Sequence, residues 1–386
     1  MTWCRFFLIK MQIIVAGIVL TAAATPAADY RYLAYVGTYT DKDSRGIYAY
    51  RFDPASGEAE SVGLAAETQN PSFLAVNPNY KFLYAVNEID TFEGASTGAI
   101  SAFVIDKQSG KLRQLQQISS AGAGPAHISV DKTGRYVLVA NYNSGNIAVF
   151  PIESDGRLGP RTAFVQHTGS SVDKERQSSP HAHEIQASND NRFVFVPDLG
   201  LDELLIYRFD STSGTLAASR PPFVKVSPGS GPRHLAVSPS GRFIYLVNEL
   251  SSTVTVFSYD VSSGRLQRQQ TISTLAREFK GENTTAEIET DASGRFLYVS
   301  NRGEDSIAVF GIDRQGKLSL VQRVPTGGKT PRHFRLDPTG KWMFVANQDS
   351  DTINLFTVDP ASGRLTATSR SLKAPSPVCL VFVPLS

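Results

Sequence analysis

The stretch GPRHLAVSPSGRFIYLVNE, residues 231–249, has the pattern of two short apolar strands joined by a Pro-Ser-Gly turn. A second stretch, TPRHFRLDPTGKWMFVANQ at 330–348, has the same shape. Each places an Arg-His pair just before the first strand and an Asn at the end of the second. This recurrence indicates an internal repeat, and it raises the question of what the charged residues at the strand ends do.

Four further segments and a closing half-unit follow the same pattern. They are NPSFLAVNPNYKFLYAVNE (70–88), GPAHISVDKTGRYVLVANY (124–142), PHAHEIQASNDNRFVFVPD (180–198), TTAEIETDASGRFLYVSNR (284–302) and SPVCLVFVP (376–384). The equivalent first-strand positions are Phe73, His127, His183, His234, Glu287, His333 and Cys379. Their mean spacing of about 51 residues lies in the range of β-propeller repeats.

Each unit continues with two more strands. An example is TVTVFSYD (253–260), followed by a Ser-Gly turn and a more polar strand that begins Gly-Arg-Leu at 264–266. The C-terminus supplies only a first strand, while residues 32–40 and 46–54 match second and third strands. Joining the two ends completes a seventh blade and protects its sheet edges. We therefore predict an all-β fold over residues 30–386, a seven-bladed β-propeller with four antiparallel strands per blade, closed by one C-terminal and three N-terminal strands.

The N-terminal segment differs from the rest of the chain. Two basic residues precede an apolar run at 13–24, and small residues follow it. This pattern predicts a secretory signal peptide over residues 1–28, and therefore a periplasmic or secreted protein. The alternative is an uncleaved anchor, although the run is short for a membrane span. Since Cys4 falls in this segment, the mature chain keeps only Cys379 and forms no intramolecular disulfide.

Composition restricts the classes of partner. The chain has 386 residues, of which 41% are hydrophobic and 19% charged, so a large folded core is possible. Its formal net charge is +2, and we find no cluster of Lys and Arg of the kind that a nucleic-acid surface needs. We expect a monomer that binds a small molecule, with no nucleic-acid partner and no membrane contact after signal cleavage.

The repeat brings charged residues to one rim of the propeller. The first strand of each blade lines the central channel and the second runs antiparallel to it, so the start of one meets the end of the other. In a regular strand Arg233 and His234 point to opposite sides, so only one of them is expected to face the channel unless the strand has not yet begun there. The Asn residues that end the second strands are expected to hold turns. The rim residues are His127, His181, His183, Glu184, Arg233, His234, Glu249, Glu287, Arg302, Arg332 and His333.

Other site chemistries find less support in the sequence. His181 and His183 alternate as metal ligands can, but no compact third ligand follows, so we expect no metal and no other cofactor; a metal held with carboxylates from distant blades is the alternative. We find no G-x-S-x-G elbow between a strand and a helix, and no Gly-rich loop that opens a helix. The polar loops 89–98, 166–180 and 276–286 are long enough to form a lid over the rim, or they are solvated connections.

The repeated motifs resemble those of the propeller lactonase family, which includes the bacterial 6-phosphogluconolactonase of propeller type and the fungal carboxymuconate-cyclising enzyme. The similarity extends over nearly the whole chain after the signal segment. Its most specific stretches are GPAHISVD (124–131), YNSGN (142–146), PHAHE (180–184), and the segments 231–260, 286–310 and 330–351. The resemblance implies a metal-independent propeller that opens, or forms, a lactone ring in its central cleft.

Export bears on the substrate that this resemblance implies. A phosphorylated sugar lactone belongs to the cytosol, so another sugar lactone or a lactone from aromatic degradation suits an exported protein better. A lactone-forming cyclase and a non-catalytic binding propeller remain open alternatives, because fold alone does not decide function.

Lactone hydrolysis needs a base that activates water and a donor that stabilises the oxyanion. Arginine stays protonated, so it suits the second role. We assign Arg233 and Arg332 to the substrate anion and the oxyanion. Glu287 and His183 are the candidate bases, with Glu287 placed first as the carboxylate among the equivalent first-strand positions. The residues expected to bind or orient the substrate are His127, His181, His234, Glu249, Arg302 and His333.

Overall fold

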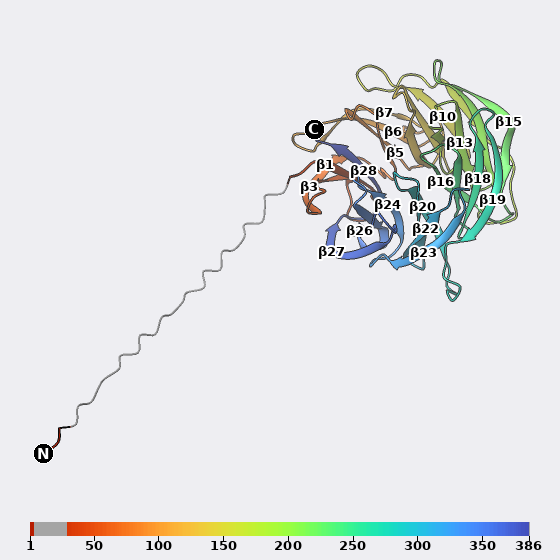
Figure 1. Cartoon of the computed structure of the whole chain (residues 1–386). Helices are drawn as coiled ribbons and strands as arrows, with labels where there is room; N and C mark the ends of the chain where they lie inside the picture. Colours follow the sequence, from red (N-terminus) through yellow and green to blue (C-terminus); the bar gives the residue numbers. More distant parts are fainter. Residues whose placement is uncertain (4–28, 386) are drawn as a thin grey trace.

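The computed structural model describes residues 1–3 and 29–385. The described chain forms seven four-stranded antiparallel sheets around a central channel (Figure 1), which confirms the predicted seven-bladed propeller. The predicted signal peptide, residues 1–28, lies outside the described residues apart from its first three. Within the described ranges, no helix has the length and apolar character needed to cross a membrane.

The first strand of each sheet is the innermost one. First strands of neighbouring sheets contact each other around the channel, so their side chains line it. These inner strands are β28 (Pro377–Pro384), β4 (Leu74–Val76), β8 (Pro125–Val130), β12 (Gln186–Ala187), β16 (Pro232–Val237), β20 (Thr284–Thr290) and β24 (Pro331–Leu336).

The second and third strands form the core, because each is covered on both faces by neighbouring sheets. This explains their nearly continuous apolar sequences, such as FIYLVN. The second strands are β1 (Tyr32–Thr38), β5 (Phe82–Asn87), β9 (Tyr136–Asn141), β13 (Phe193–Asp198), β17 (Phe243–Asn248), β21 (Phe296–Arg302) and β25 (Trp342–Asn347). The third strands are β2 (Gly46–Asp53), β6 (Ala99–Ile105), β10 (Asn146–Pro151), β14 (Glu203–Asp210), β18 (Thr253–Asp260), β22 (Ser306–Ile312) and β26 (Thr352–Val358). A short 3-10 helix, η1 (Gln348–Ser350), follows β25.

The outer strands are polar because one edge of each faces solvent. They are β3 (Glu58–Glu67), β7 (Leu112–Ser119), β11 (Ala163–Gln166), β15 (Thr215–Lys225), β19 (Arg265–Ser273), β23 (Leu318–Pro325) and β27 (Leu365–Lys373). The Ser-Gly turns that lead into them pack against the preceding blade. Gly264 has φ +76°, and a Cβ placed there would lie 2.3 Å from the ring of Phe193 in the preceding blade. Gly363 packs on Phe296 in the same way, so these turns require glycine for both conformation and space.

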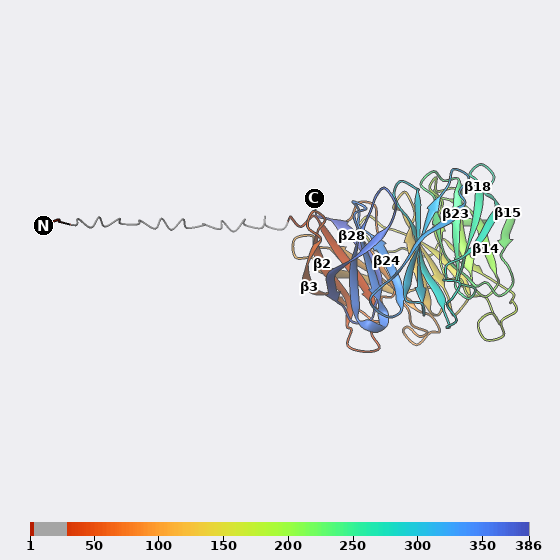
Figure 2. The ribbon, with the colours of Figure 1, turned by 60° about the horizontal axis from the view of Figure 1, so that its bottom comes forward.

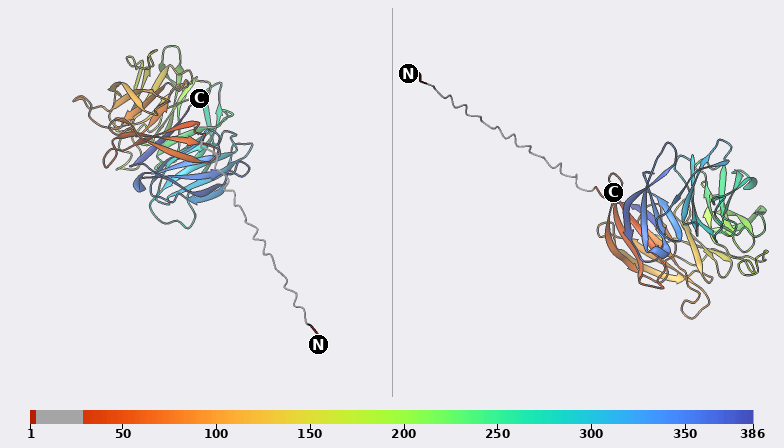
Figure 3. Two further views of the ribbon diagram at one scale, coloured as in Figure 1. Left: turned by 90° about the vertical axis from the view of Figure 1, so that its left-hand side faces the viewer. Right: turned by 90° about the horizontal axis from the view of Figure 1, so that it is seen from below.

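The two ends of the propeller close the ring. β28 pairs antiparallel with β1, from Tyr32 opposite Pro384 to Thr38 opposite Pro377, as the sequence predicts. Figures 2 and 3 show the blue C-terminal strands beside the red-orange N-terminal ones from several directions. The apolar core is divided into seven clusters, each packed between two neighbouring sheets. Stability is therefore distributed around the ring, and closure completes the last interface.

Candidate active site

A β-bulge at the start of β16 decides how the Arg-His pair is presented. Pro232 lies opposite Asn248, so the start of the first strand and the end of the second do meet at one rim. The register then shifts between Pro232 and His234, and Arg233 is the extra residue. Both side chains of the pair are buried, and Arg233 Nη1 lies 3.3 Å from His234 Nδ1. The bulge interrupts the two-residue alternation where the strand begins, so the two side chains lie together, and the rule that only one of them faces the channel does not apply here. The same shift in β24 releases Arg332 from the strand ladder.

The Asn residues that end the second strands have the structural role expected of them. Asn248 Nδ2 donates to the hydroxyls of Thr253 and Thr255, each at 3.0 Å. Asn141 Nδ2 donates to the Ser120 carbonyl at 3.0 Å. Both Asn side chains are fully buried and hold the strand ends at the rim.

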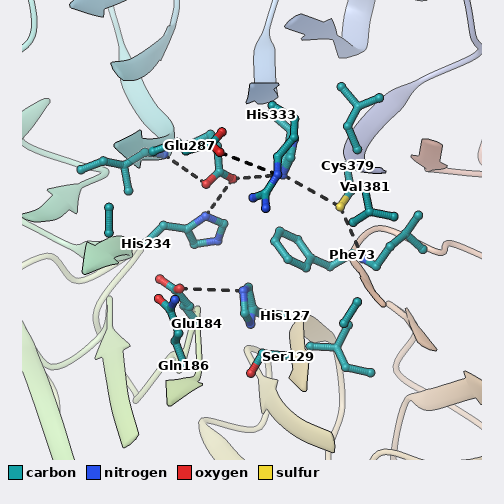
Figure 4. A pocket seen from close by; sticks show the side chains of 18 of the residues that line it. Phe73, His127, Ser129, Glu184, Gln186, His234, Glu287, His333, Cys379 and Val381 are labelled. Carbon is teal, nitrogen blue, oxygen red and sulfur yellow. Dashed lines mark hydrogen bonds and ion pairs between the residues drawn. The ribbon is translucent and has the colours of Figure 1, made fainter. Parts of the chain in front are cut away.

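The seven equivalent first-strand side chains meet on the channel axis, where they form a layer that we call the waist. The Phe73 ring lies 4.2 Å from the His127 ring and 5.6 Å from the His234 ring, measured between centroids. Glu287 Oε2 lies 3.1 Å from His234 Nδ1 and 3.4 Å from His333 Nε2 (Figure 4). The waist therefore consists of Phe73, His127, His183, His234, Glu287, His333 and Cys379.

The waist imidazoles are neutral at neutral pH. Burial, together with the neighbouring cationic side chains, lowers the pKa of His127, His183 and His234 well below 6.5. Burial also lowers the pKa of His333 to about 4. A neutral imidazole keeps a lone pair that can accept a proton, and the lowered pKa makes it a weaker base than a free imidazole.

On the rim side of the waist, three arginines contact one carboxylate. Glu249 accepts hydrogen bonds from Arg176 Nη2 at 2.7 Å and Arg233 Nε at 3.0 Å, and it forms an ion pair with Arg302 Nη2 at 2.9 Å. Burial opposes ionisation of Glu249, but Arg302, Arg233 and Arg176 outweigh it and lower its pKa to about 2. Burial, Arg302 and Arg332 lower the pKa of Arg233 to about 9, so it stays protonated at neutral pH. Glu249 is thus ionised within an excess of positive charge.

Arg332 and His183 complete this group, which we call the arginine cleft. Arg332 Nη2 donates to the Tyr39 hydroxyl at 2.7 Å, and that hydroxyl donates to Glu88 Oε2 at 2.9 Å. His183 Nε2 lies 3.8 Å from Glu249 Oε2, so this waist residue also faces the cleft. The members of the cleft are Tyr39, Glu88, Tyr142, Arg176, His181, His183, Arg233, Glu249, Arg302 and Arg332.

A separate cavity lies on the other side of the waist. It has a volume of about 490 Å³ and is lined by the C-terminal ends of the inner strands. Three carboxylates face it, from Glu184, Glu287 and Glu289, and Arg335 at its mouth lies 3.8 Å from Glu289. Burial and the nearby Glu287 raise the pKa of Glu184 well above 4.5. This cavity is therefore rich in acceptors, whereas the arginine cleft supplies the donors that an oxyanion needs.

The predicted site residues all lie along this channel, but at two levels. His181, Arg233, Glu249, Arg302 and Arg332 lie in the cleft, and His183 joins the cleft to the waist. The other four lie in the waist and line the cavity beyond it: His127, His234, Glu287 and His333. The two candidate bases therefore face different sides of the waist: His183 faces the arginine cleft, and Glu287 faces the cavity.

The His181-Ala-His183 pair packs against one aromatic ring. The His181 ring stacks on Tyr142 at 4.4 Å, and the His183 ring meets Tyr142 edge-on at 5.2 Å. Among residues 1–3 and 29–385, no group of three His, Cys, Asp or Glu side chains is placed to hold a metal ion.

Sequence reasoning missed four cleft residues, three of which share a repeat position. Tyr39, Glu88 and Tyr142 directly follow the ends of their second strands, at the position that Glu249 and Arg302 occupy in later blades. Aligning the repeats at this position could have found them. Arg176 has no such signal, because it comes from the insertion 166–180.

Comparison with known proteins supports this assignment of fold and family. A family model described as "Lactonase, 7-bladed beta-propeller" matches residues 33–382. The chain belongs to this lactonase family. The lactonase is 36% identical over 284 residues to the 6-phosphogluconolactonase of Bacillus subtilis, an alignment that covers 74% of this chain and 78% of the relative. It is 34% identical to the 6-phosphogluconolactonase of Formosa agariphila, covering 72% and 79% of the two chains. A solved structure described as the periplasmic gluconolactonase of Pseudomonas aeruginosa superposes with a TM-score of 0.87 at 38% identity, covering 92% of the lactonase and all of the relative.

Proposed function

We propose that this lactonase hydrolyses a sugar or carboxylated lactone in the arginine cleft. The observation that carries the proposal is the meeting of a neutral imidazole, His183, an ionised carboxylate, Glu249, and four guanidinium groups at one mouth of the channel. The names of the relatives favour hydrolysis over cyclisation and over a binding module without catalysis.

The proposed reaction uses water and the residues of the cleft. His183 takes a proton from a water molecule as the water oxygen bonds to the lactone carbonyl carbon. The resulting oxyanion is stabilised by Arg233 and Arg332, with Arg302 in support. The bond between the carbonyl carbon and the ring oxygen then breaks, and the ring oxygen takes the proton from the imidazolium. Glu249 stabilises that imidazolium, and the product is an open-chain hydroxy acid.

We place His183 ahead of Glu287 as the base. Glu287 is hydrogen-bonded to the Ile288 amide at 3.1 Å and contacts His234 and His333 within the waist. It also lines the cavity that lacks the cluster of guanidiniums. In this proposal Glu287 and His234 hold the side chains of the waist in position, and His127 packs beside them in the same layer.

The test compares two arginines on the same strand. Arg332 and Arg335 both lie on β24, but Arg332 faces the cleft and Arg335 the mouth of the opposite cavity. Hydrolysis of a lactone panel is followed by pH-stat. We expect Arg332→Ala to reduce kcat/KM on the order of a hundredfold, as removal of an oxyanion donor does. Arg335→Ala is the matched control, expected to keep normal activity.

The outcome also decides whether the cleft or the cavity is the active site, and whether His183 or Glu287 is the base. If Arg335→Ala abolishes turnover while Arg332→Ala does not, the cavity is the active site and the cleft assignment is wrong. His183→Gln should lower kcat further than Glu287→Gln, and the reverse order would restore Glu287 as the base. Failure of the wild type to hydrolyse any lactone of the panel would favour the binding module.

We also propose that the protein is exported. The apolar run at 13–24 and the small residues after it support cleavage, and the relative from Pseudomonas aeruginosa is described as periplasmic. N-terminal sequencing of the mature protein should begin near Ala28 or Asp29. Intact residues 1–28 on a cytosolic protein would contradict export and would favour phosphogluconolactone as the substrate.

A further inference from the structure

The insertion 166–180 holds its own arginine in a defined place at the rim. Ser171 Oγ donates to Asp202 Oδ2 at 2.6 Å, and Gln177 Nε2 donates to the Leu199 carbonyl at 2.8 Å. The backbone amide of Arg176 donates to Asp173 Oδ1 at 3.0 Å. The insertion is therefore anchored on both sides of Arg176 and presents this side chain to the cleft.

Arg176 differs from the arginines beneath it in how it is held. Arg233 Nη1 donates to the Ala286 carbonyl at 2.6 Å, and Arg302 Nη2 donates to the Thr285 carbonyl at 2.9 Å. Their side chains are 3% and 13% exposed, against 41% for Arg176. In the described part of the chain, Arg176 makes side-chain hydrogen bonds only through Nη2, to Glu249 and to the Tyr142 hydroxyl. Its other guanidinium nitrogens remain available at the solvent side of the cleft.

The charge balance of the cleft favours an additional anion. Arg176, Arg233, Arg302 and Arg332 carry four positive charges, and Glu249 and Glu88 are the carboxylates bonded within the group. The His183 imidazole adds no charge, because burial and the nearby arginines lower its pKa well below 6.5. Two of the four positive charges are therefore not matched by a carboxylate bonded within the cleft, and a carboxylate or phosphate on the substrate would compensate them.

We propose that Arg176 is a specificity-determining residue that binds an anionic substituent at the outer end of the substrate and so selects charged lactones over neutral ones. This inference rests on the proposed function. Arg233 and Arg332, with Arg302 in support, hold the reacting carbonyl end, and Arg176 contacts the substituent that points toward solvent. Glu249 stays paired with the two deeper arginines when Arg176 turns to the substrate, so the exchange leaves no buried carboxylate unpaired.

The experiment uses two substrates that differ only in the substituent at C6. Glucono-δ-lactone is neutral there, and 6-phosphogluconolactone carries a phosphate. For Arg176→Gln we expect kcat/KM for the phosphorylated lactone to fall on the order of tenfold or more, chiefly through KM, with a much smaller change for the neutral lactone. Arg176→Lys should recover part of the loss. The matched control is Lys174→Gln, which removes the same charge from an exposed position of the same insertion and should leave the ratio unchanged.

A binding measurement separates failure of this inference from failure of the proposed function. Calorimetric titration with the open-chain products, 6-phosphogluconate and gluconate, needs no turnover. Weaker binding of 6-phosphogluconate by Arg176→Gln, with gluconate unaffected, supports the inference even where lactone hydrolysis is not found. Equal effects of Arg176→Gln and Lys174→Gln on the two substrates and the two products would overturn it, whereas activity of the wild type would still support lactone hydrolysis.

Discussion

Replacing Glu249 with Gln removes the charge that Arg176, Arg233 and Arg302 share. The amide keeps the size of the carboxylate, so packing changes little. The pKa of this buried carboxyl is about 2, compared with an ordinary value of 4.5. A pKa difference of that size corresponds to about 3 kcal/mol of stabilisation of the folded protein. We therefore expect Glu249→Gln to lower the free energy of unfolding by about 3 kcal/mol at pH 7.

The dependence on pH has a definite sign. The folded pKa lies below the unfolded one, so the contribution of Glu249 is complete above about pH 4.5 and is lost as the pH falls toward 2. The difference between the wild type and Glu249→Gln should stay constant from pH 7 to pH 5 and shrink below pH 4.5.

Urea denaturation followed by circular dichroism at several pH values measures this difference. The control is Glu67→Gln, which makes the same change in an exposed ion pair with Arg45 at 2.6 Å. Exposed pairs contribute little to stability, so the control should resemble the wild type. A loss below about 1 kcal/mol for Glu249→Gln at pH 7 would refute the reasoning, because three arginines that hold the carboxylate ionised must stabilise the fold by more than that.

Three further predictions concern the fold. Deleting residues 375–386 removes β28 and its buried apolar side chains, each of which stabilises the fold by about 1.5–3 kcal/mol. Thermal melting followed by circular dichroism should therefore show an unfolded or severely destabilised chain. An unchanged Tm would contradict the closure of the ring. Gly264→Ala should destabilise more than Gly340→Ala, because both glycines have positive φ but only the first would place its Cβ against Phe193; equal Tm losses would contradict this packing. Burial lowers the pKa of His333 to about 4, so unfolding takes up a proton between pH 6.5 and 4, and the folded protein loses stability as the pH falls through this range. His333→Gln should reduce this loss by about 3 kcal/mol at pH 4. Urea unfolding of both proteins at pH 7 and pH 4 measures the difference.

Several features of the site follow from the repeat, because the repeat spacing is a local property of the chain. The first-strand positions that share one register, from Phe73 to Cys379, do meet at one level of the channel. The same register places Glu249 and Arg302 at the ends of second strands and explains why they reach one rim. Tyr39 occupies the same position in the blade that the chain ends complete, so it too was available from the sequence.

Other features depend on contacts between blades and could not be predicted in this way. The bulges beside Arg233 and Arg332 are displacements of one residue between paired strands, and they leave no mark in the hydrophobic pattern. They turn both arginines out of the ladder and bring Arg233 against His234. The approach of Arg176 to Glu249 joins two segments 73 residues apart through an insertion without a repeat counterpart.

The sequence by itself determined the number of blades, the way the ring closes and the rim where the charged residues gather, because strand alternation and repeat period are carried by neighbouring residues. The tertiary structure alone decided that the waist divides the channel. As a result His183 faces the arginines and Glu287 the opposite cavity, although both occupy the same position of the repeat. It also decided which groups are charged, because the neutral imidazoles and the ionised Glu249 depend on burial and on guanidiniums from other blades.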